Sequence, residues 1–323
     1  MGYEPPFDRT AAIDDLCMEI AELVGMLHPS SELSANPVLH RKLRISIIRS
    51  SLLIEGNTLS EDAVTAIIDG KRVLGPPKDV REVQNAHRAY ELIGDLNPYS
   101  LEDLLRAHRV MMEGLVDQPG CFRSSNVGVF DGDVLIHAGT PARYVAQVMA
   151  DLFDWLASTD LHPLLASCVF HYEFEFAHPF ADGNGRTGRL WHTLLLAHWR
   201  PVLAWLPVDS VICRRQQDYY ASLARSNAAG SSEIFVEFML RVIRDALLPY
   251  AKPKGKAEQR ESDVLDFLSR NPTATVVQLA AAIGCSKRSA ERSVSDLRAQ
   301  GRLVREGSAR AGRWVVVEIE GLQ

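Results

Sequence analysis

The sequence predicts a mainly α-helical protein that carries one β-hairpin and ends in a separate small domain. Six segments place apolar residues three or four positions apart, which is the period of a helix packed on a core. These segments are residues 43–54, 101–115, 145–156, 164–176, 190–199 and 234–248. The sequence lacks the long apolar strand patterns of a parallel sheet. A polar stretch with two prolines at residues 249–256 is typical of a linker between domains.

Charge is unevenly distributed along the 323 residues, whose formal net charge is −6. Residues 252–323 contain 13 Lys or Arg and 9 Asp or Glu, a net of +4, which leaves a net of −10 on the rest of the chain. A basic C-terminal domain beside an acidic body is a clue to binding partners rather than to the fold.

Membrane and secreted classes are not favoured by the sequence. No apolar run approaches the roughly 18 to 20 residues that span a bilayer, and the first residues lack the apolar centre of a signal peptide. The five cysteines are odd in number, and no two have Cys-x-x-Cys spacing. We therefore expect a cytoplasmic protein with reduced thiols and no contact with a membrane.

Residues 126–137 break the helical pattern. Val127 and Val129 precede an Asp131-Gly132 pair, and two further β-branched residues follow it. Two short β-prone runs about such a pair predict a hairpin. Taken alone, this pattern indicates a surface excursion between helices.

The C-terminal domain is predicted to contain three helices and two strands. The helices are expected at residues 258–270, 276–283 and 287–300, and the strands at 302–305 and 313–318. Gly284 can end the second helix and Ser286 can cap the third. This order resembles a winged helix-turn-helix domain, whose third helix would carry the basic residues Lys287, Arg288, Arg292 and Arg298.

The residues best suited to catalysis and ligand binding are concentrated in segment 178–189, His-Pro-Phe-Ala-Asp-Gly-Asn-Gly-Arg-Thr-Gly-Arg. Pro179 disfavours the α conformation at His178, so the preceding helix should end there. The glycines that follow allow a tight loop whose backbone can approach a ligand closely. A new helix is expected to begin near Gly185, and its free N–H groups favour an anion such as phosphate.

Three side-chain types in this segment suit nucleotide chemistry. Arg186 and Arg189 are three apart on the expected helix, so both can reach the same side. Asp182 offers a hard oxygen for Mg²⁺, and His178 offers a base that titrates near neutrality. Each feature alone is common, but the ordered set indicates a nucleotide phosphate site with a proton acceptor beside it.

At these residues the sequence resembles the Fic family, which transfers AMP from ATP to protein hydroxyl groups. The family signature His-Pro-Phe-x-(Asp/Glu)-Gly-Asn-Gly-Arg-x-x-Arg is matched at every specified position, and the resemblance extends over about residues 11–248. It implies an all-helical Fic bundle with a β-hairpin flap. The implied organisation is an N-terminal helical region with an inhibitory motif (1–95), a catalytic core (96–250), a linker (251–257) and a winged-helix domain (258–323).

The resemblance also implies roles for individual residues. His178 would be the general base, and Asp182 would hold Mg²⁺ at the α- and β-phosphates. Arg189 would hold the γ-phosphate of ATP. The remaining nucleotide-binding positions of the signature would be Gly183, Asn184, Gly185, Arg186, Thr187 and Gly188.

Two further regions gain a meaning from the resemblance. The hairpin resembles the Fic flap, which pairs with the backbone of the target protein, and its docking residues would be Val127, Gly128, Val129 and Phe130. Relatives carry adenosine contacts where this chain has Tyr219, Tyr220 and Asn227. The two tyrosines fit the role of core aromatic residues on a helix equally well. His171 is interpreted as a structural helix residue rather than a second base.

A second motif concerns control of activity. Residues 51–56, Ser-Leu-Leu-Ile-Glu-Gly, resemble the family's inhibitory sequence, (Ser/Thr)-x-x-x-Glu-(Gly/Asn). In the family this glutamate pairs with the second arginine of the signature. The resemblance therefore assigns inhibitory roles to Ser51, Glu55 and Gly56, with Glu55 competing for the guanidinium of Arg189.

These observations lead to one main hypothesis and two alternatives. The main hypothesis is a protein adenylyltransferase that uses ATP and Mg²⁺, modifies a Ser, Thr or Tyr hydroxyl of a target protein, and is autoinhibited by Glu55. One alternative is a hydrolase that removes AMP with the help of Glu55. The other is a DNA-binding regulator whose Fic part senses nucleotide. For the winged helix, contact with DNA and docking of a protein are both considered, and a homodimer is also considered.

Overall fold

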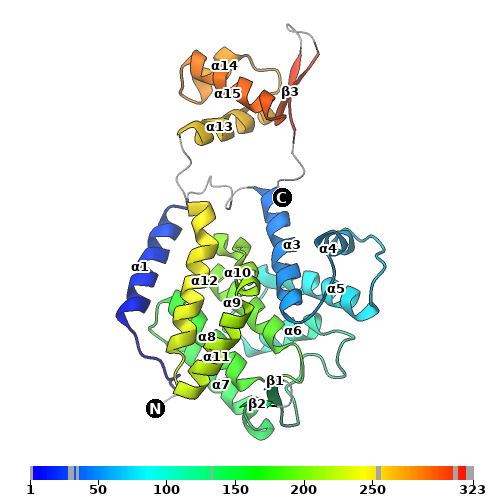
Figure 1. Cartoon of the computed structure of the whole chain (residues 1–323), viewed down its shortest axis with the longest axis vertical. Helices are drawn as coiled ribbons and strands as arrows, with labels where there is room; N and C mark the ends of the chain where they lie inside the picture. The colour runs from blue at the N-terminus through cyan, green and yellow to red at the C-terminus, as the bar shows by residue number, and fades with distance from the viewer. Residues whose placement is uncertain are drawn as a thin grey trace. The chain divides into compact units, whose positions relative to one another are not determined.

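The computed structural model of the chain describes residues 3–27, 33, 36–131, 134–251, 256–307 and 312–317, with only the backbone described for the parts of 128–138 and 256–258 that it includes. The chain divides into two compact units, Met1–Ala251 and Lys252–Gln323. The described part is mostly helical, as predicted (Figure 1).

The described residues of the first unit form a bundle of helices with one hairpin (Figure 1). Its helices are α1 (Ala11–Gly25), α3 (Pro37–Ile54), α4 (Glu61–Ile68), α5 (Pro77–Glu91), α6 (Leu101–Met111), α7 (Ala142–Ser158), α8 (Pro163–Ala177), α9 (Asn184–Trp199), α10 (Val208–Arg214), α11 (Gln216–Ala229) and α12 (Glu233–Ala251), with short 3-10 turns at η1 (Leu92–Gly94) and η2 (Pro201–Trp205).

Helices α8 and α9 pack against each other at the centre of this unit. Both are buried over most of their length. Helix α8 is apolar on nearly every side, whereas α9 also buries polar residues such as Arg186 and Arg189. Phe170, Phe174 and Trp191 are fully buried there and form the aromatic part of the core. Helix α1 packs along α12.

Side-chain caps define where several helices begin. Asn36 accepts hydrogen bonds from the backbone N–H groups of Val38 and Leu39 at the start of α3. Ser100 accepts from the N–H of Asp103 at the start of α6. Such caps satisfy N–H groups that a helix leaves unpaired and typically contribute about 1 kcal/mol each.

The predicted hairpin is present as β1 (Gly128–Asp131) and β2 (Val134–Ala138), which pair antiparallel. The register pairs Gly128 with Ala138 and shifts by one residue after Val129. The turn residues 132 and 133 lie outside the described residues, and only the backbone is described at the predicted docking positions Gly128, Val129 and Phe130.

The second unit has the element order of a winged helix-turn-helix domain. It contains α13 (Lys256–Arg270), α14 (Val276–Ala282), α15 (Lys287–Ala299), β3 (Leu303–Glu306) and β4 (Arg313–Val316). Strands β3 and β4 pair antiparallel. A small core around Leu268, Leu279 and Trp314 holds helices and strands together, so this unit has its own hydrophobic centre.

The predicted linker is shorter in the structure than in the sequence-based expectation. Helix α12 continues through Pro249 to Ala251, and α13 begins at Lys256, so only residues 252–255 fall between them, outside the described residues. A proline within a helix costs about 3 kcal/mol. Burial of Leu247 and Ala251 in the core favours continuation of the last turn of α12 despite Pro249.

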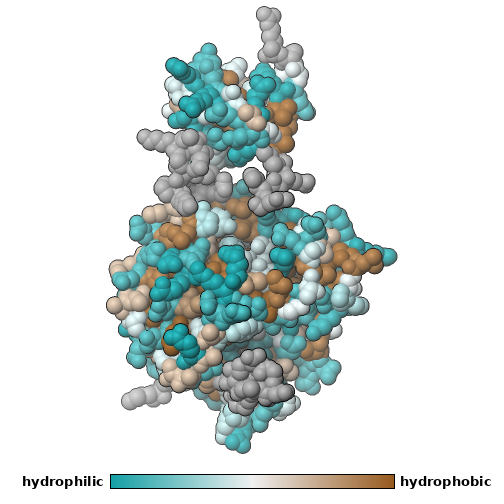
Figure 2. Space-filling view, in the orientation of Figure 1, coloured by the Kyte–Doolittle hydropathy of each residue, from teal (hydrophilic) through white to brown (hydrophobic). Residues whose placement is uncertain are grey.

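Hydrophilic residues cover most of the visible face of each unit (Figure 2). Over the part of the chain that is described, no helix combines the length and apolar character needed to cross a membrane.

Candidate functional site

The backbone turns sharply at His178, directly after α8. His178 is the one residue other than glycine with a positive φ among the described residues, with φ 48° and ψ 60°. This left-handed conformation typically costs about 1–2 kcal/mol in a residue with a Cβ. The helix therefore ends where Pro179 predicts, and the turn places the half-buried imidazole at the start of the signature loop.

The loop that follows is fixed by a buried side-chain network. The side-chain amide of Asn184 accepts from the N–H of Phe180 at 2.8 Å and donates to its carbonyl at 2.9 Å. The Phe180 ring is fully buried and stacks on the His108 ring, with centroids 3.6 Å apart. The Asn184 side chain thus holds the loop closed, and the contact with phosphate that the family resemblance implies for Asn184 stays a prediction.

His108 holds the other side of this loop as a neutral imidazole. Its Nδ1 accepts from the Gly120 N–H at 2.8 Å, so Nε2 carries the proton and donates to the Asp182 carbonyl at 3.0 Å. Burial lowers the pKa of His108 to about 4; the hydrogen bond to Asp182 opposes this effect, and the Arg186 charge adds to it.

Helix α9 begins directly after the loop with no side-chain cap. Gly183 is its N-cap residue with φ 82°. A Cβ on Gly183 would lie 2.5 Å from the sulfur of Met112, and a Cβ on Gly185 would lie 2.5 Å from Oε1 of Glu55. Gly183 therefore requires glycine, because its φ is positive as well, and a Cβ on Gly185 would displace the carboxylate of Glu55. The uncapped helix start is the arrangement that favours an anion.

Arg186 is buried between two carboxylates. Its Nη1 donates to Glu82 at 3.0 Å and its Nη2 donates to Asp182 at 2.9 Å. Glu82 is itself buried and also accepts from the side chain of Asn57 at 2.9 Å. Glu82 therefore links Asn57, which follows the inhibitory motif, to Arg186 of the signature.

Arg189 is bound by the inhibitory motif and by a buried aspartate. It donates to Ser51 Oγ at 3.0 Å, to the Ser51 carbonyl at 2.9 Å and to Glu55 at 2.9 Å, and Asp209 lies 3.9 Å from its Nε. Burial acts to lower the pKa of Arg189, but the Glu55 and Asp209 charges outweigh burial and raise it above the ordinary value. The expected pairing of Glu55 with Arg189 is thus present in the structure.

A further carboxyl group, Glu175, lies close to this cluster. A Cβ on Gly188 would lie 2.7 Å from its Oε1 and would force the Glu175 carboxyl group to shift. Burial raises the pKa of Glu175 to about 7, the charges of His178 and Arg189 lower it, and that of Glu55 raises it. Glu175 thus interacts electrostatically with His178, Arg189 and Glu55 together.

The proposed adenosine residues lie on α11 and in different surroundings. Tyr219 is buried, and its hydroxyl lies 3.3 Å from Nε2 of His171, itself fully buried. Tyr220 is 48% exposed. Asn227 accepts from the hydroxyl of Tyr172 at 3.0 Å. The structure thus places Tyr219 and His171 in the core, and of the two tyrosines only Tyr220 presents its ring to solvent; nucleotide contacts by all three α11 residues stay predictions.

Asp182 is the single signature carboxylate, with 47% of its side chain exposed. No cluster of three or more His, Cys, Asp or Glu side chains suited to a metal occurs within the described residues. Mg²⁺ commonly binds through one or two carboxylates plus substrate phosphates. The exposed Asp182 at an uncapped helix start fits that mode of binding.

Thr187 and Gly188 complete the signature in the first turn of α9. Both are buried, and the Thr187 N–H bonds the Gly183 carbonyl at 3.0 Å. Because both residues are buried, they hold the start of α9 against the core.

Four residues at or around this site were not singled out from the sequence: Glu82, His108, Glu175 and Asp209. Glu82, His108 and Asp209 are buried on their helices, and the side chain of Glu175 is 11% exposed. Glu82 lies beside Val83 and Ala86 on the apolar stripe of α5, and Glu175 interrupts the apolar run of α8. A charged residue on an apolar stripe is the signal that could have identified both.

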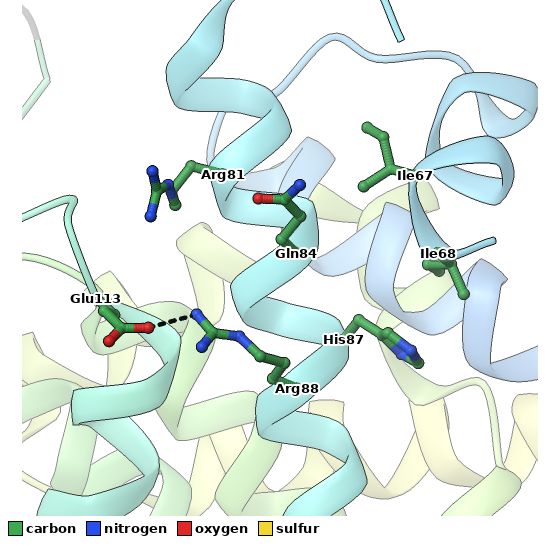
Figure 3. A pocket seen from close by; sticks show the side chains of 7 residues that line it. All are labelled: Ile67, Ile68, Arg81, Gln84, His87, Arg88 and Glu113. Carbon is green, nitrogen blue, oxygen red and sulfur yellow. Dashed lines mark ion pairs between the residues drawn. The ribbon is translucent and has the colours of Figure 1, made fainter. Parts of the chain in front are cut away.

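A separate shallow cavity of about 410 Å³ lies along α5, and no signature residue lines it (Figure 3). The charge of Arg88 in its lining is neutralised by an ion pair with Glu113 at 2.6 Å. The lining residues are Ile67, Ile68, Arg81, Gln84, His87, Arg88 and Glu113.

Comparison with known protein families gives two matches. Residues 98–196 match the family model described as Fic/DOC family, and residues 258–313 match the one described as MarR family. A crystal structure of a Fic family protein from Desulfovibrio desulfuricans G20 is 41% identical and superposes with a TM-score of 0.75, covering 99% of this chain and 100% of that one.

Two similar proteins carry the name of an enzyme. Protein adenylyltransferase Fic from Nematostella vectensis is 30% identical over 231 residues, which are 66% of this chain and 51% of that protein. Protein adenylyltransferase fic-1 from Caenorhabditis elegans is 30% identical over 207 residues, 59% of this chain and 38% of that protein. The chain thus spans about half, or less, of the length of these two relatives.

Proposed function

The chain belongs to the Fic family, and we propose that it is a protein adenylyltransferase that moves AMP from ATP to a hydroxyl side chain of a target protein. The observation that carries the proposal is the position of His178. His178 has a left-handed backbone and stands at the start of the signature loop. The same loop ends at the start of α9, which has no side-chain cap. The similarity to proteins named protein adenylyltransferase supports the same reaction.

In this proposal His178 accepts the proton of the target hydroxyl while the oxygen attacks the α-phosphorus of ATP. A bond forms between that oxygen and the phosphorus, the bond to the β-phosphate oxygen breaks, and pyrophosphate leaves. A positioned base typically contributes about 10²–10⁴-fold. Phosphate charge would be met by the N–H groups of α9 and by Arg186.

Asp182 would hold a Mg²⁺ ion together with the phosphates. When bound, the ion supplies charge neutralisation at the phosphates. The half-exposed Asp182 carboxylate is suited to this role because it faces solvent at the helix start.

The structure supports an autoinhibited form of this enzyme. Arg189, the proposed partner of the γ-phosphate, has its guanidinium bound by Glu55 and Ser51. A γ-phosphate would therefore have to displace the Glu55 carboxylate. We infer that ATP binds without the contact to Arg189 until Glu55 moves away.

The test compares ATP labelled on the α-phosphate with ATP labelled on the γ-phosphate. Glu55→Gly should increase transfer of the α label to protein, and the γ label should not be transferred. Adding His178→Ala to Glu55→Gly should abolish transfer. Equal labelling by the two variants, or transfer of the γ label, would contradict the proposal.

A second candidate reaction is removal of AMP from a modified target. Glu55 keeps 25% of its side chain exposed, so its carboxylate remains accessible to a water molecule that it could activate. Release of AMP from a modified target by the unaltered protein, lost in Glu55→Gly, would favour this reaction.

The C-terminal unit supports a third candidate, a DNA-binding regulator. The MarR-type match and the exposed basic residues of α15 favour contact with phosphates. In the described part of the chain, Arg288 and Arg298 form no ion pair, whereas Lys287 and Arg292 pair within the helix. Salt-dependent binding to DNA should weaken in Arg288→Ala and persist in the control Arg270→Ala, and absence of such binding would exclude this role.

A further inference from the structure

Arg123 lies beneath the signature loop with its side chain buried. The residue is 5% exposed. Its Nε donates to the carbonyl of His178 at 2.7 Å, and its Nη2 donates to the carbonyl of Ala177 at 3.3 Å. The backbone N–H of Arg123 donates to the Pro179 carbonyl at 3.0 Å. Three consecutive carbonyls around the left-handed turn are therefore held by one residue.

The same guanidinium binds both ends of the hairpin. Nη1 donates to the Ser125 carbonyl at 2.9 Å, just before β1. Nη2 donates to the Thr140 carbonyl, just after β2. Arg123 thus connects the residues that flank the two strands of the flap with the backbone of His178.

The charge of Arg123 is met by carbonyl oxygens rather than by an acid. No carboxylate pairs with it among the side chains that the structure describes, whereas the buried Arg186 and Arg189 of the signature both have such partners. A buried cation without a counter-charge is costly. A planar guanidinium can bond several carbonyls at fixed angles, which the single ammonium of lysine cannot do.

Gly139 brings the hairpin into direct contact with this arrangement. A Cβ on Gly139 would lie 3.1 Å from Nη2 of Arg123 and 3.5 Å from the Cβ of His178. The Gly139 N–H also bonds the carbonyl of Val127 at 3.2 Å and so closes the base of the hairpin. The end of the flap, the guanidinium and the Cβ of His178 therefore lie close together.

We propose that Arg123 is a positioning residue that couples the flap to His178, so that the target hydroxyl and its proton acceptor are placed together. This inference rests on the proposed adenylyl transfer. The flap would place the target by pairing with its backbone, and Arg123 would fix the flap and the turn at His178 relative to each other. Alignment of the hydroxyl with the base then depends on a single side chain.

The test uses the full chain carrying Glu55→Gly, with Arg123→Lys and Arg123→Met compared with Arg106→Met, an exposed arginine on α6. Transfer to a protein acceptor should fall about 100-fold in Arg123→Met and in Arg123→Lys, because small misplacements of reacting groups cost about that much. Binding of a non-hydrolysable ATP analogue should change less than about threefold, because the hydrogen bonds of Arg123 go to residues 125, 140 and 177–179 and not to the proposed phosphate-binding residues 182–189. Transfer equal to that of Arg106→Met, or parallel loss of analogue binding and transfer, would overturn the proposal.

Hydrogen exchange separates this proposal from the proposed reaction. If Arg123 couples the two elements, Arg123→Lys should speed amide exchange in both residues 124–142 and 174–182. Gly139→Ala, which disturbs the hairpin end, should speed exchange in 174–182 as well. Faster exchange in only one of the two segments would overturn the coupling even if transfer occurs. If the parent shows no transfer, the proposed function fails while the exchange result still decides the coupling.

Discussion

Glu55 and Arg189 are 134 residues apart in the sequence, yet the Glu55 carboxylate lies 2.9 Å from Nη2 of Arg189. The arginine side chain is 1% exposed, so its charge has no solvent to screen it. Ser51 adds two hydrogen bonds to the same guanidinium. A buried cation saturated in this way is a poor partner for a further anion until one of its ligands leaves.

The first prediction concerns nucleotide affinity. Glu55→Gly should strengthen binding of ATP about tenfold or more, which corresponds to about 1.4 kcal/mol. The reason is that the γ-phosphate gains a guanidinium that the glutamate had occupied. ADP lacks that phosphate, so its affinity should stay nearly constant. Titration calorimetry with both nucleotides checks the difference, and an equal gain for ADP would show that Glu55 does not compete with the γ-phosphate.

The second prediction isolates Ser51 from its neighbour. Ser51→Ala removes one of the acceptors of Arg189 but leaves the Ser51 carbonyl in place. Losing one such hydrogen bond should weaken the inhibited form and raise ATP affinity about threefold. Ser50→Ala is the matched control, because Ser50 is also buried on α3 but bonds Ser210. Equal effects of the two substitutions would assign the change to packing of α3.

The third prediction concerns the carboxylate that links the motifs. Glu82→Gln keeps the shape of the side chain but removes the charge that faces buried Arg186. Removing one partner of a buried ion pair should lower the free energy of unfolding by about 3 kcal/mol. Chemical denaturation measures this change, and Glu91→Gln, an exposed substitution on the same helix, should change it little. A loss no larger than that of Glu91→Gln would mean that Asp182 alone satisfies Arg186.

The sequence was sufficient to predict the helical class, the hairpin and the winged helix because each depends on a local pattern. The end of α8 before His178 follows from Pro179, whereas the left-handed conformation of His178 does not, because a residue before proline favours an extended backbone. The start of α9 follows from the glycines before it. The pairing of Glu55 with Arg189 was expected only from the family resemblance, since no local pattern joins residues so far apart.

Other features depend on contacts that no local pattern carries. Helix α5 has few apolar residues, and it was not predicted because its stripe of Val83, Ala86 and Ala89 is short. Glu82 lies on that stripe, and its partners come from two distant segments. Tyr219 and Tyr220 are adjacent in sequence, so only the packing of α11 could show that the first is buried and the second exposed.

The last prediction concerns pH and rests on Glu175. Its pKa is raised to about 7, mainly by burial, so the folded protein holds this proton more tightly than the unfolded chain, in which a carboxyl group titrates near 4.5. Stability contributed by the protonated form is therefore complete below about pH 4.5 and is lost as the pH rises through about 7. Glu175→Gln cannot ionise and avoids this loss.

Compared with Glu175→Gln, the unaltered protein should become less stable by up to about 3 kcal/mol between about pH 5 and pH 8. Denaturation at a series of pH values measures this difference, and the exposed substitution Glu102→Gln should leave the pH profile unchanged. Glu55 raises the pKa of Glu175, whereas His178 and Arg189 lower it. Glu55→Gly should therefore shift the fall in stability to lower pH. A profile that is flat between pH 5 and 8, or that shifts upward in Glu55→Gly, would show that Glu175 is not held protonated beside the His178 and Arg189 cluster.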